Sequence, residues 1–141
     1  MVKKKVFVSY DHDNDREYRH LLEEWNINPD FEFCFNNQSP NEIKKEDIPR
    51  VKDALTDKIN QASHVFVIIG KEANKENKYH EELGYKNWQN FEVAKSKAGK
   101  KKLVCVKLDK KFESPDELDD CGAKCVMTFT EEAILKALKD A

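Results

Sequence analysis

The hydrophobic run His64–Ile69 constrains the fold more than any other stretch of the chain. It reads His-Val-Phe-Val-Ile-Ile and is the most apolar run in the sequence. Its short length and β-branched residues favour a strand over a buried helix. Its apolar residues do not alternate with polar ones, which is typical of a strand covered on both faces in a parallel sheet. The run Lys5–Tyr10 has the same character, so we expect two neighbouring central strands with helices on each side.

The rest of the chain alternates between strand and helix patterns. Aromatic and β-branched runs predict three more strands, at 31–35, 103–108 and 125–129. Helical spacing predicts four helices. The first is capped by Asp13 or Asn14, the second starts at Asp47, the third runs from about Asn87 to Gly99, and the fourth is capped by Thr130. Their core-facing residues are expected to be Tyr18, Leu21, Leu22 and Trp25; Ile48, Val51, Leu55, Ile59 and Ala62; Phe91, Ala94 and Ala98; and Ile134, Leu135 and Leu138. Short helical turns are predicted to start at Ser39–Glu42 and Ser114–Glu117.

These elements predict one α/β domain over residues 1–141. The expected architecture is a three-layer sandwich around a flavodoxin-like, five-stranded parallel sheet in the order 2-1-3-4-5. In that order the carboxyl ends of the first and third strands lie side by side, at the edge where open α/β sheets bind ligands. The residues that this edge would bring into one cleft are Ser9, Tyr10 and Asp11, Asn36 and Asn37, Gly70, and the start of the Trp88 helix.

The charge balance gives no reason to expect a nucleic-acid or membrane partner. The chain has 25 basic and 27 acidic residues, so no net field attracts a polyanion. Lys3–Lys5 and Lys100–Lys102 both precede strands and would form a solvated face opposite the cleft. No run approaches the roughly 20 apolar residues of a membrane span. The first residues lead into a strand without a signal-peptide core, so we expect a cytoplasmic location.

The four cysteines are predicted to be reduced thiols. They are Cys34, Cys105, Cys121 and Cys125, in a chain without an export signal. No second Cys or His pair stands at ligand spacing from Cys121 and Cys125, which argues against zinc. We interpret the cysteines as small core residues.

Several cofactor and phosphotransfer chemistries are excluded by missing motifs. The four glycines form neither a dinucleotide-binding turn after the first strand nor a phosphate-binding loop. Flavin is disfavoured because Asp11, Asp13 and Asp15 would repel its phosphate. A phosphoacceptor domain would need an aspartate after the third strand, where Gly70 stands. Acids at a helix start complement the helix dipole, so we expect no metal at the three aspartates.

Four segments together resemble the TIR-like domains. They are Val6–Asp11, the strand end Phe33–Asn37, Phe66–Gly70 and the Trp-x-x-x-Glu segment Trp88–Glu92. The resemblance covers nearly the whole chain and is closest to the small stand-alone bacterial group that includes the Thoeris anti-phage sensor proteins. It implies a TIR-like fold and an enzyme that cleaves NAD as its substrate and needs no cofactor.

The resemblance also implies a set of site residues. Glu92 matches the glutamate that breaks the bond between nicotinamide and ribose, yielding ADP-ribose, a cyclic isomer or a conjugate as a signal. The implied substrate-binding residues are Ser9, Tyr10, Asp11, Asn36, Asn37, Gly70 and Trp88. Implied partners are NAD, other TIR-like domains, and a downstream effector reached through the diffusible product.

Two other functions stay open. Lys86 replaces a serine often found two residues before the tryptophan, and the proline-glycine loop after the second strand is absent. These departures keep open a non-catalytic interaction module. A nucleoside deoxyribosyltransferase-like enzyme, which shares the sheet and a glutamate nucleophile, is the third reading.

The segment Lys71–Lys86 is longer than usual for such folds. Its few apolar side chains predict a mobile lid that becomes ordered over the cleft when a nucleotide or partner binds. Tyr79, Leu83 and Tyr85 are the exceptions. They are interpreted either as packing that tethers a static loop or as stacking surfaces for a nucleotide base.

Overall fold

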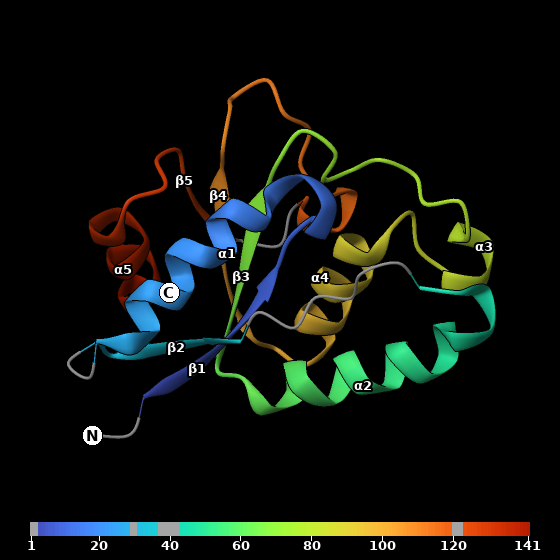
Figure 1. Cartoon of the computed structure of the whole chain (residues 1–141), viewed down its shortest axis with the longest axis horizontal. Coiled ribbons are helices and arrows are strands. Elements are labelled where there is room, and N and C mark those ends of the chain that lie inside the picture. The colour runs from blue at the N-terminus through green and yellow to red at the C-terminus, as the bar shows by residue number, and fades with distance from the viewer. Residues whose placement is uncertain (1–2, 29–30, 37–42, 120–122) are drawn as a thin grey trace.

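The protein, as a computed structural model, is built on one five-stranded parallel sheet in the order β2-β1-β3-β4-β5 (Figure 1). The structure describes residues 3–28, 31–36, 43–119 and 123–141. The strands are β1 (Lys4–Ser9), β2 (Phe33–Asn36), β3 (His64–Ile69), β4 (Lys102–Lys107) and β5 (Lys124–Val126). The helices are α1 (His12–Ile27), α2 (Ile48–Gln61), α3 (His80–Leu83), α4 (Trp88–Ala98) and α5 (Glu131–Asp140), with short 3-10 helices η1 (Lys45–Asp47) and η2 (Asp116–Leu118). The predicted fold class and strand order are confirmed.

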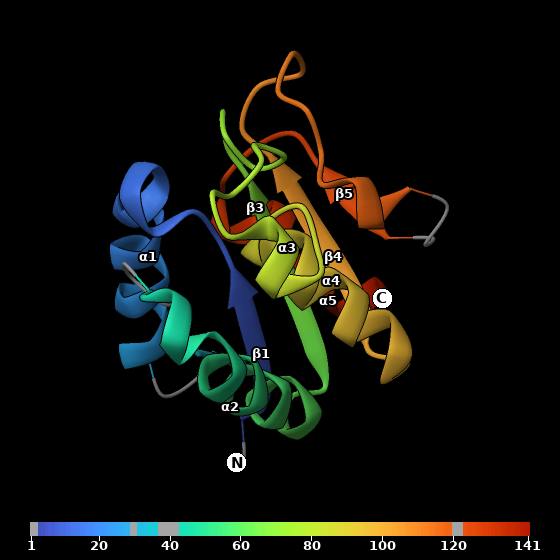
Figure 2. The same ribbon diagram turned by 90° about the vertical axis from the view of Figure 1, so that its right-hand side faces the viewer.

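Helices cover both faces of the sheet and form two hydrophobic cores. Helices α1 and α5 lie on one face, and α2, α3 and α4 lie on the other (Figures 1 and 2). Along β1, Val6 and Val8 pack with the first pair of helices, whereas Phe7 packs with the second group. Strand β3 is buried along its whole length. As predicted, its apolar residues do not alternate with polar ones because the strand is covered on both faces.

The strand register sets the height of each loop at the carboxyl edge. Ser9 of β1 pairs with Val67 of β3, and both strands run into this edge. Strand β2 is an edge strand and ends lower than β1, since its last residue, Asn36, pairs with Phe7. Its outer side is protected by Asn26 of α1, whose side chain bonds both the N–H and the carbonyl of Phe35 at 2.8 and 2.9 Å.

The helix starts predicted from capping residues are largely confirmed. Asn87 caps α4 by accepting the N–H of Asn90, and Thr130 caps α5 by accepting the N–H of Ala133. Helix α2 begins at Ile48, preceded by η1, and buries the predicted stripe. The acidic turn predicted around Ser114–Glu117 forms η2. The turn predicted at Ser39–Glu42 lies outside the described residues.

Some local predictions are wrong by part of a turn. Helix α1 begins at His12, so Asp13 and Asn14 lie inside its first turn, after the cap position. Leu21 is 40% exposed and Ala98 is exposed, because each lies at the margin of its helix's buried stripe. The second strand begins two residues later than predicted, and β5 ends at Val126.

The prediction of reduced cysteines is wrong for Cys105 and Cys125, and the prediction of buried cysteines is wrong for Cys34. Cys105 and Cys125 form a disulfide between β4 and β5. They are register partners in adjacent strands, and this pairing brings their Cα atoms to 4.4 Å. Cys34 is a free thiol and is exposed on the edge strand. Cys121 lies outside the described residues.

No helix within the described part of the chain is long and apolar enough to cross a membrane.

Candidate active site

Ser9 and Glu92 meet at the carboxyl edge of the sheet. Helix α4 packs over the ends of β1 and β3, and the Ser9 hydroxyl donates a 2.7 Å hydrogen bond to Glu92 Oε1. Ser9 is the last residue of β1 and points to the same face as Phe7 because strand side chains alternate. This pair lies at the β1/β3 switch point of the sheet, the place where flavodoxin-like folds bind ligands.

Gln89 fixes α4 to the two strands that form the edge. Its amide donates to the carbonyl of Ile68 at 2.8 Å and to the carbonyl of Ser9 at 3.3 Å. One helical turn beyond Glu92, the Ser96 hydroxyl donates to the carbonyl of Glu92 at 2.7 Å. All of these side chains are buried. The helix therefore holds the carboxyl of Glu92 in a fixed position against Ser9.

The environment of Glu92 stabilises its neutral form. The residue is 1% exposed, and Oε2 has no hydrogen-bond partner among the residues that the structure describes. Burial raises the pKa of the Glu92 carboxyl to about 8, against the opposing effect of the Ser9 hydrogen bond. A buried carboxyl with one unpaired oxygen is costly to the fold, and such groups cluster at functional sites.

A second buried acid, Asp15, lies at the same edge. It is 4% exposed, and its Oδ2 also lacks a partner within the described ranges. Burial, followed by the charges of Asp11, Glu17 and Glu72, raises the pKa of Asp15 to about 7, and Lys71 acts in the opposite direction. A Cβ added to Gly70 would overlap the Asp15 carboxyl, so the absent side chain of Gly70 leaves the space that Asp15 occupies.

The other predicted site residues lie at different depths around this edge. Tyr10 is buried, and its pKa is raised by burial, although Arg19 opposes the shift and the charge of Glu92 adds to it. Asp11 is half-buried between β1 and α1. Trp88 is half-buried at the start of α4, where its ring packs edge-on against Phe91.

Two asparagines were predicted at the turn after the second strand. The backbone of Asn36 ends β2 beside Phe7, two residues short of Ser9 in register. Asn37 lies outside the described residues. The structure thus joins Ser9 directly to Glu92 and leaves Asn36 lower along the sheet. No group of three or more potential metal ligands occurs in the described part of the chain.

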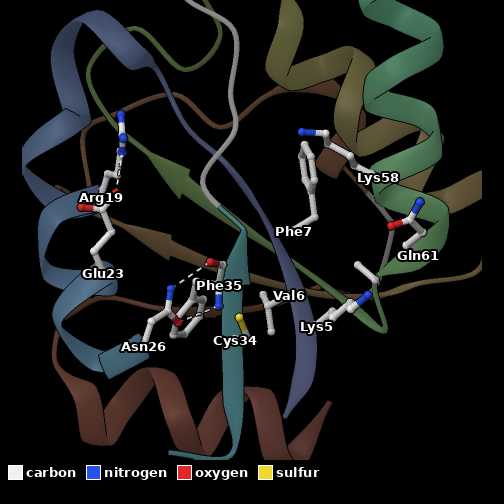
Figure 3. A pocket seen from close by; sticks show the side chains of 11 residues that line it. Lys5, Val6, Phe7, Arg19, Glu23, Asn26, Cys34, Phe35, Lys58 and Gln61 are labelled. Carbon is white, nitrogen blue, oxygen red and sulfur yellow. Dashed lines mark hydrogen bonds and ion pairs between the residues drawn. The ribbon is translucent and has the colours of Figure 1, made fainter. Parts of the chain in front are cut away.

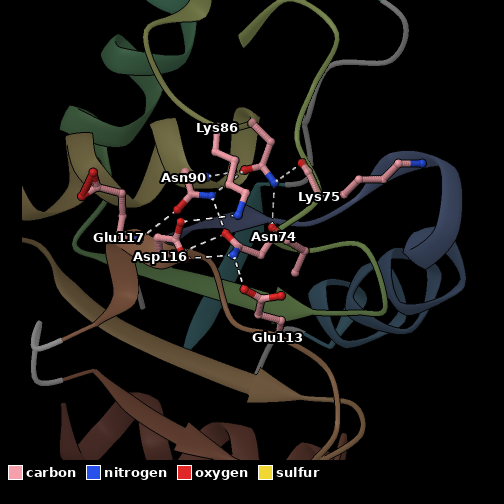
Figure 4. A network of polar contacts seen from close by, with 9 residues as sticks. Asn74, Lys75, Lys86, Asn90, Glu113, Asp116 and Glu117 are labelled. Carbon is pink, nitrogen blue, oxygen red and sulfur yellow. Dashed lines mark hydrogen bonds and ion pairs between the residues drawn. The ribbon is translucent and has the colours of Figure 1, made fainter.

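A network of three buried asparagines holds the start of α4. Asn90 joins Asn74 and Asn87, because its Nδ2 donates to the Oδ1 of each at 3.0 Å. The network reaches η2 and the segment before it, where Asn74 bonds Glu113 and Asp116 at 2.7 and 2.9 Å (Figure 4). Asn90 lies two residues before Glu92. The network therefore connects the loops after β3 and β4 to the helix that carries the acid.

The same contacts bear on the segment Lys71–Lys86. It contains the short helix α3, and its Leu83 is buried in the α2/α4 core with Tyr79 and Tyr85 packed against it. Asn87 donates to the carbonyls of Ala73 and Lys75 at 2.8 and 2.9 Å. These contacts favour the interpretation of the three apolar residues as packing that tethers the loop.

A cavity in the described structure lies away from Ser9 and Glu92. It measures about 490 Å³ and opens between α1, α2 and the strands β1 and β2 (Figure 3). Its lining residues are Lys5, Val6, Phe7, Arg19, Glu23, Asn26, Cys34, Phe35, Lys58, Gln61 and Ala62. Asp15, Gly70 and Glu92 do not line it, so the cavity is not the site of the two buried acids.

Sequence reasoning missed Asp15 and Gln89 as parts of the site. Asp15 was interpreted only as an acid that complements a helix dipole, because nothing in its local sequence shows that it faces Gly70. Gln89 had a detectable signal, since it lies three residues before Glu92 and hence on a neighbouring part of the same helix face. The asparagine network had none, because its members meet only in the folded chain.

The fold and the site define a class: a doubly wound α/β domain with a buried glutamate at the β1/β3 switch point. The chain matches the family model of the TIR-like domain of the Thoeris protein ThsB over residues 7–113. This match covers more than half of the chain, which therefore belongs to the Thoeris ThsB TIR-like family. The resemblance seen in the sequence is confirmed.

Among solved structures, the chain is similar to a CMP N-glycosidase of Clostridium botulinum, BcmB. The two share 13% identity with a TM-score of 0.55, over 96% of this chain and 98% of that one. At this identity the likeness concerns the fold. The comparison with curated proteins gives no match.

Proposed function

We propose that this TIR-like protein cleaves the bond between nicotinamide and ribose in NAD, with Glu92 as the catalytic residue. The observation that carries the proposal is the buried Glu92 carboxyl, which Ser9 holds at 2.7 Å at the edge where this fold binds ligands. Membership of the Thoeris ThsB TIR-like family supports NAD as the substrate. By the same reasoning, the product is a signal for a downstream effector in anti-phage defence.

The chemistry suits a single carboxylate. The bond between ribose C1′ and the ring nitrogen breaks, and its electron pair neutralises the cationic nicotinamide, so no acid has to protonate the leaving group. The Glu92 anion stabilises the positive charge that develops on the ribose. A water molecule or a hydroxyl of the same nucleotide then bonds to C1′ and loses a proton, giving ADP-ribose or a cyclic isomer.

Substrate charge and the pKa of Glu92 are coupled in this mechanism. With a pKa of about 8, the carboxyl is mostly protonated at pH 7 before the substrate binds. A bound nicotinamide ring brings a positive charge close to the carboxyl, which favours its ionised form. Ser9 acts as a positioning residue, because its hydrogen bond favours the anion and fixes Oε1.

The test is nicotinamide release from NAD, measured by chromatography. We expect Glu92→Gln to lose release by at least 100-fold, because an amide cannot supply the negative charge. Glu24→Gln is the matched control, since Glu24 is an exposed acid on α1. The assay uses protein purified from cells with and without phage challenge, in case an activating signal is needed. Equal turnover by the Glu92→Gln protein would remove Glu92 from this role.

A nucleotide N-glycosidase is a second candidate function. The observation that favours it is the neutral Glu92, because a base that leaves an uncharged nucleotide needs a proton and a carboxyl with a pKa of about 8 carries one at pH 7. The solved structure titled as a CMP N-glycosidase has a similar fold. Offering CMP and deoxynucleosides in place of NAD distinguishes the two reactions.

A non-catalytic role predicts the opposite pattern. A TIR-like interaction module that assembles with other TIR-like domains would show no cleavage of NAD or CMP after phage challenge. Its phenotype in cells would survive Glu92→Gln and would be lost with substitutions on the surface. This outcome would replace the enzymatic proposal.

A further inference from the structure

We propose that Asp15 binds the hydroxyls of a second sugar in a dinucleotide substrate, remote from the bond that Glu92 cleaves. This inference rests on the proposed function and assigns the other half of the substrate to a specific residue. Asp15 is a buried acid on α1, its Oδ2 has no partner among the described residues, and it occupies the space beside Gly70. The cleavage mechanism above assigns no role to Asp15.

The strand register places the two acids at different heights along the sheet. Ser9, which holds Glu92, pairs with Val67, and Gly70 follows Val67 by three residues. Three residues of extended chain span about 10 Å. The acids also lie on opposite faces, because Glu92 is on α4 and Asp15 is on α1. From this placement we expect a dinucleotide to reach both acids and a mononucleotide held at Glu92 to end before Asp15.

The charges around Asp15 select the chemistry of its ligand. Asp11 and Glu72 lie near it together with Glu17 on α1, and Lys71 is the nearby cation. This acidic environment repels a phosphate and favours an uncharged group that donates hydrogen bonds. A sugar diol has two such donors, and carboxylates bind ribose hydroxyls in dinucleotide-binding folds. The pyrophosphate of the substrate would then pass between the two acids.

Gly70 makes this position possible. A Cβ at residue 70 would overlap the Asp15 carboxyl, so glycine at this position leaves the room in which that carboxyl lies. The contact holds the carboxyl at the end of the central strand. Because both acids are covered in the structure, nucleotide entry must part the chain segments that cover them.

The experiment compares substrates that share one scissile bond. NAD contains both sugars, nicotinamide mononucleotide lacks the second sugar, and NADP carries a phosphate on it. We expect Asp15→Asn to raise the KM for NAD at least tenfold, with less than a threefold change in kcat or in turnover of the mononucleotide. The preference for NAD over NADP should fall at least tenfold, because the repelling carboxylate is removed. Glu24→Gln, which removes an exposed acid elsewhere on the same helix, should leave both ratios within threefold.

A binding measurement separates this inference from the proposed function. NAD is titrated calorimetrically into the Glu92→Gln protein with and without Asp15→Asn, so the result does not depend on cleavage. We expect the second substitution to weaken NAD binding at least tenfold and binding of nicotinamide mononucleotide less than threefold. Equal weakening for both ligands, or no weakening for either, would show that Asp15 is only structural and would overturn the inference, even if Glu92 cleaves NAD.

Discussion

Two buried polar groups lie at the carboxyl edge of this sheet, and they differ in how completely they are paired. The asparagine network of Asn74, Asn87 and Asn90 has hydrogen-bond partners for all its buried side-chain atoms within the described chain. Asp15 and Glu92 each keep one buried oxygen unpaired over the same residues. The asparagine network joins the segments after β3 and β4, whereas Glu92 bonds the end of β1 and Asp15 lies beside the end of β3.

The difference indicates different roles. A fully paired network rigidifies the fold and contributes to its stability, whereas an unpaired buried carboxyl costs stability and is retained where function needs it. Substitution should therefore have opposite effects in the two groups. Removing an asparagine should destabilise the protein, and removing a carboxyl should stabilise it at neutral and alkaline pH.

The largest effect on stability is expected at Asn90. Asn90→Ala removes two donated bonds and the acceptor for the N–H of Glu117, which leaves partners unpaired in the core. We expect the free energy of unfolding to fall by about 2–4 kcal/mol. The measurement is urea denaturation, with Asn60→Ala on the exposed side of α2 as the control. A loss below about 1 kcal/mol would mean that the network does not anchor α4.

The next largest effect is a change in the pH dependence of stability. The Glu92 carboxyl has an ordinary pKa of 4.5 and a pKa of about 8 in the folded protein. Between these values the unfolded chain is ionised and the folded chain keeps its proton, so the free energy of unfolding decreases as pH rises. Asp15 acts in the same direction, from 3.8 to about 7.

Glu92→Gln removes one of these two titrations. We expect the variant to exceed the wild-type protein in stability by roughly 1–3 kcal/mol at pH 8.5 and to match it near pH 4. Urea denaturation across this pH range measures the difference. If the two proteins differed in stability by the same amount at every pH, Glu92 would have an ordinary pKa. Its burial would then not cost stability, and it would not differ from the asparagine network in this respect.

A smaller effect is expected for Ser9→Ala. The Ser9 hydrogen bond lowers the pKa of Glu92 against the effect of burial, so its loss should raise that pKa further. Nicotinamide release at pH 7 should fall about tenfold, equivalent to about 1.4 kcal/mol. The acid limb of the pH–rate profile should move to higher pH. An unchanged limb with reduced activity would instead indicate that Ser9 contacts the substrate.

The contrast also shows what the sequence could predict. Hydrophobic runs, helix caps and strand order follow from local patterns, and β3, α4 and the sheet order were predicted from them. Glu92 was placed on α4, but its solvent exposure could not be inferred, because only the packing of α4 over Ser9 buries it. The Cys105–Cys125 disulfide depends in the same way on the β4/β5 register. Interactions across elements were therefore the part that local sequence did not reveal.

The smallest expected effect concerns the segment Lys71–Lys86, predicted from its sequence to be a mobile lid. Its composition is polar, but Leu83 is buried, and backbone bonds join Asn77 to Lys86 and Gly84 to His80 at 2.8 and 2.9 Å. We therefore expect the amides of Leu83 and Gly84 to be protected from hydrogen exchange in the free protein, with less than a threefold change on adding NAD. Amides of Lys71 and Glu72, which border Asp15, should change more if the nucleotide reaches that acid. If the Leu83 amide exchanges freely in the free protein and becomes protected with NAD, the segment is a mobile lid as its sequence predicted. It would then belong, with Asp15 and Glu92, to the part of the molecule that serves function.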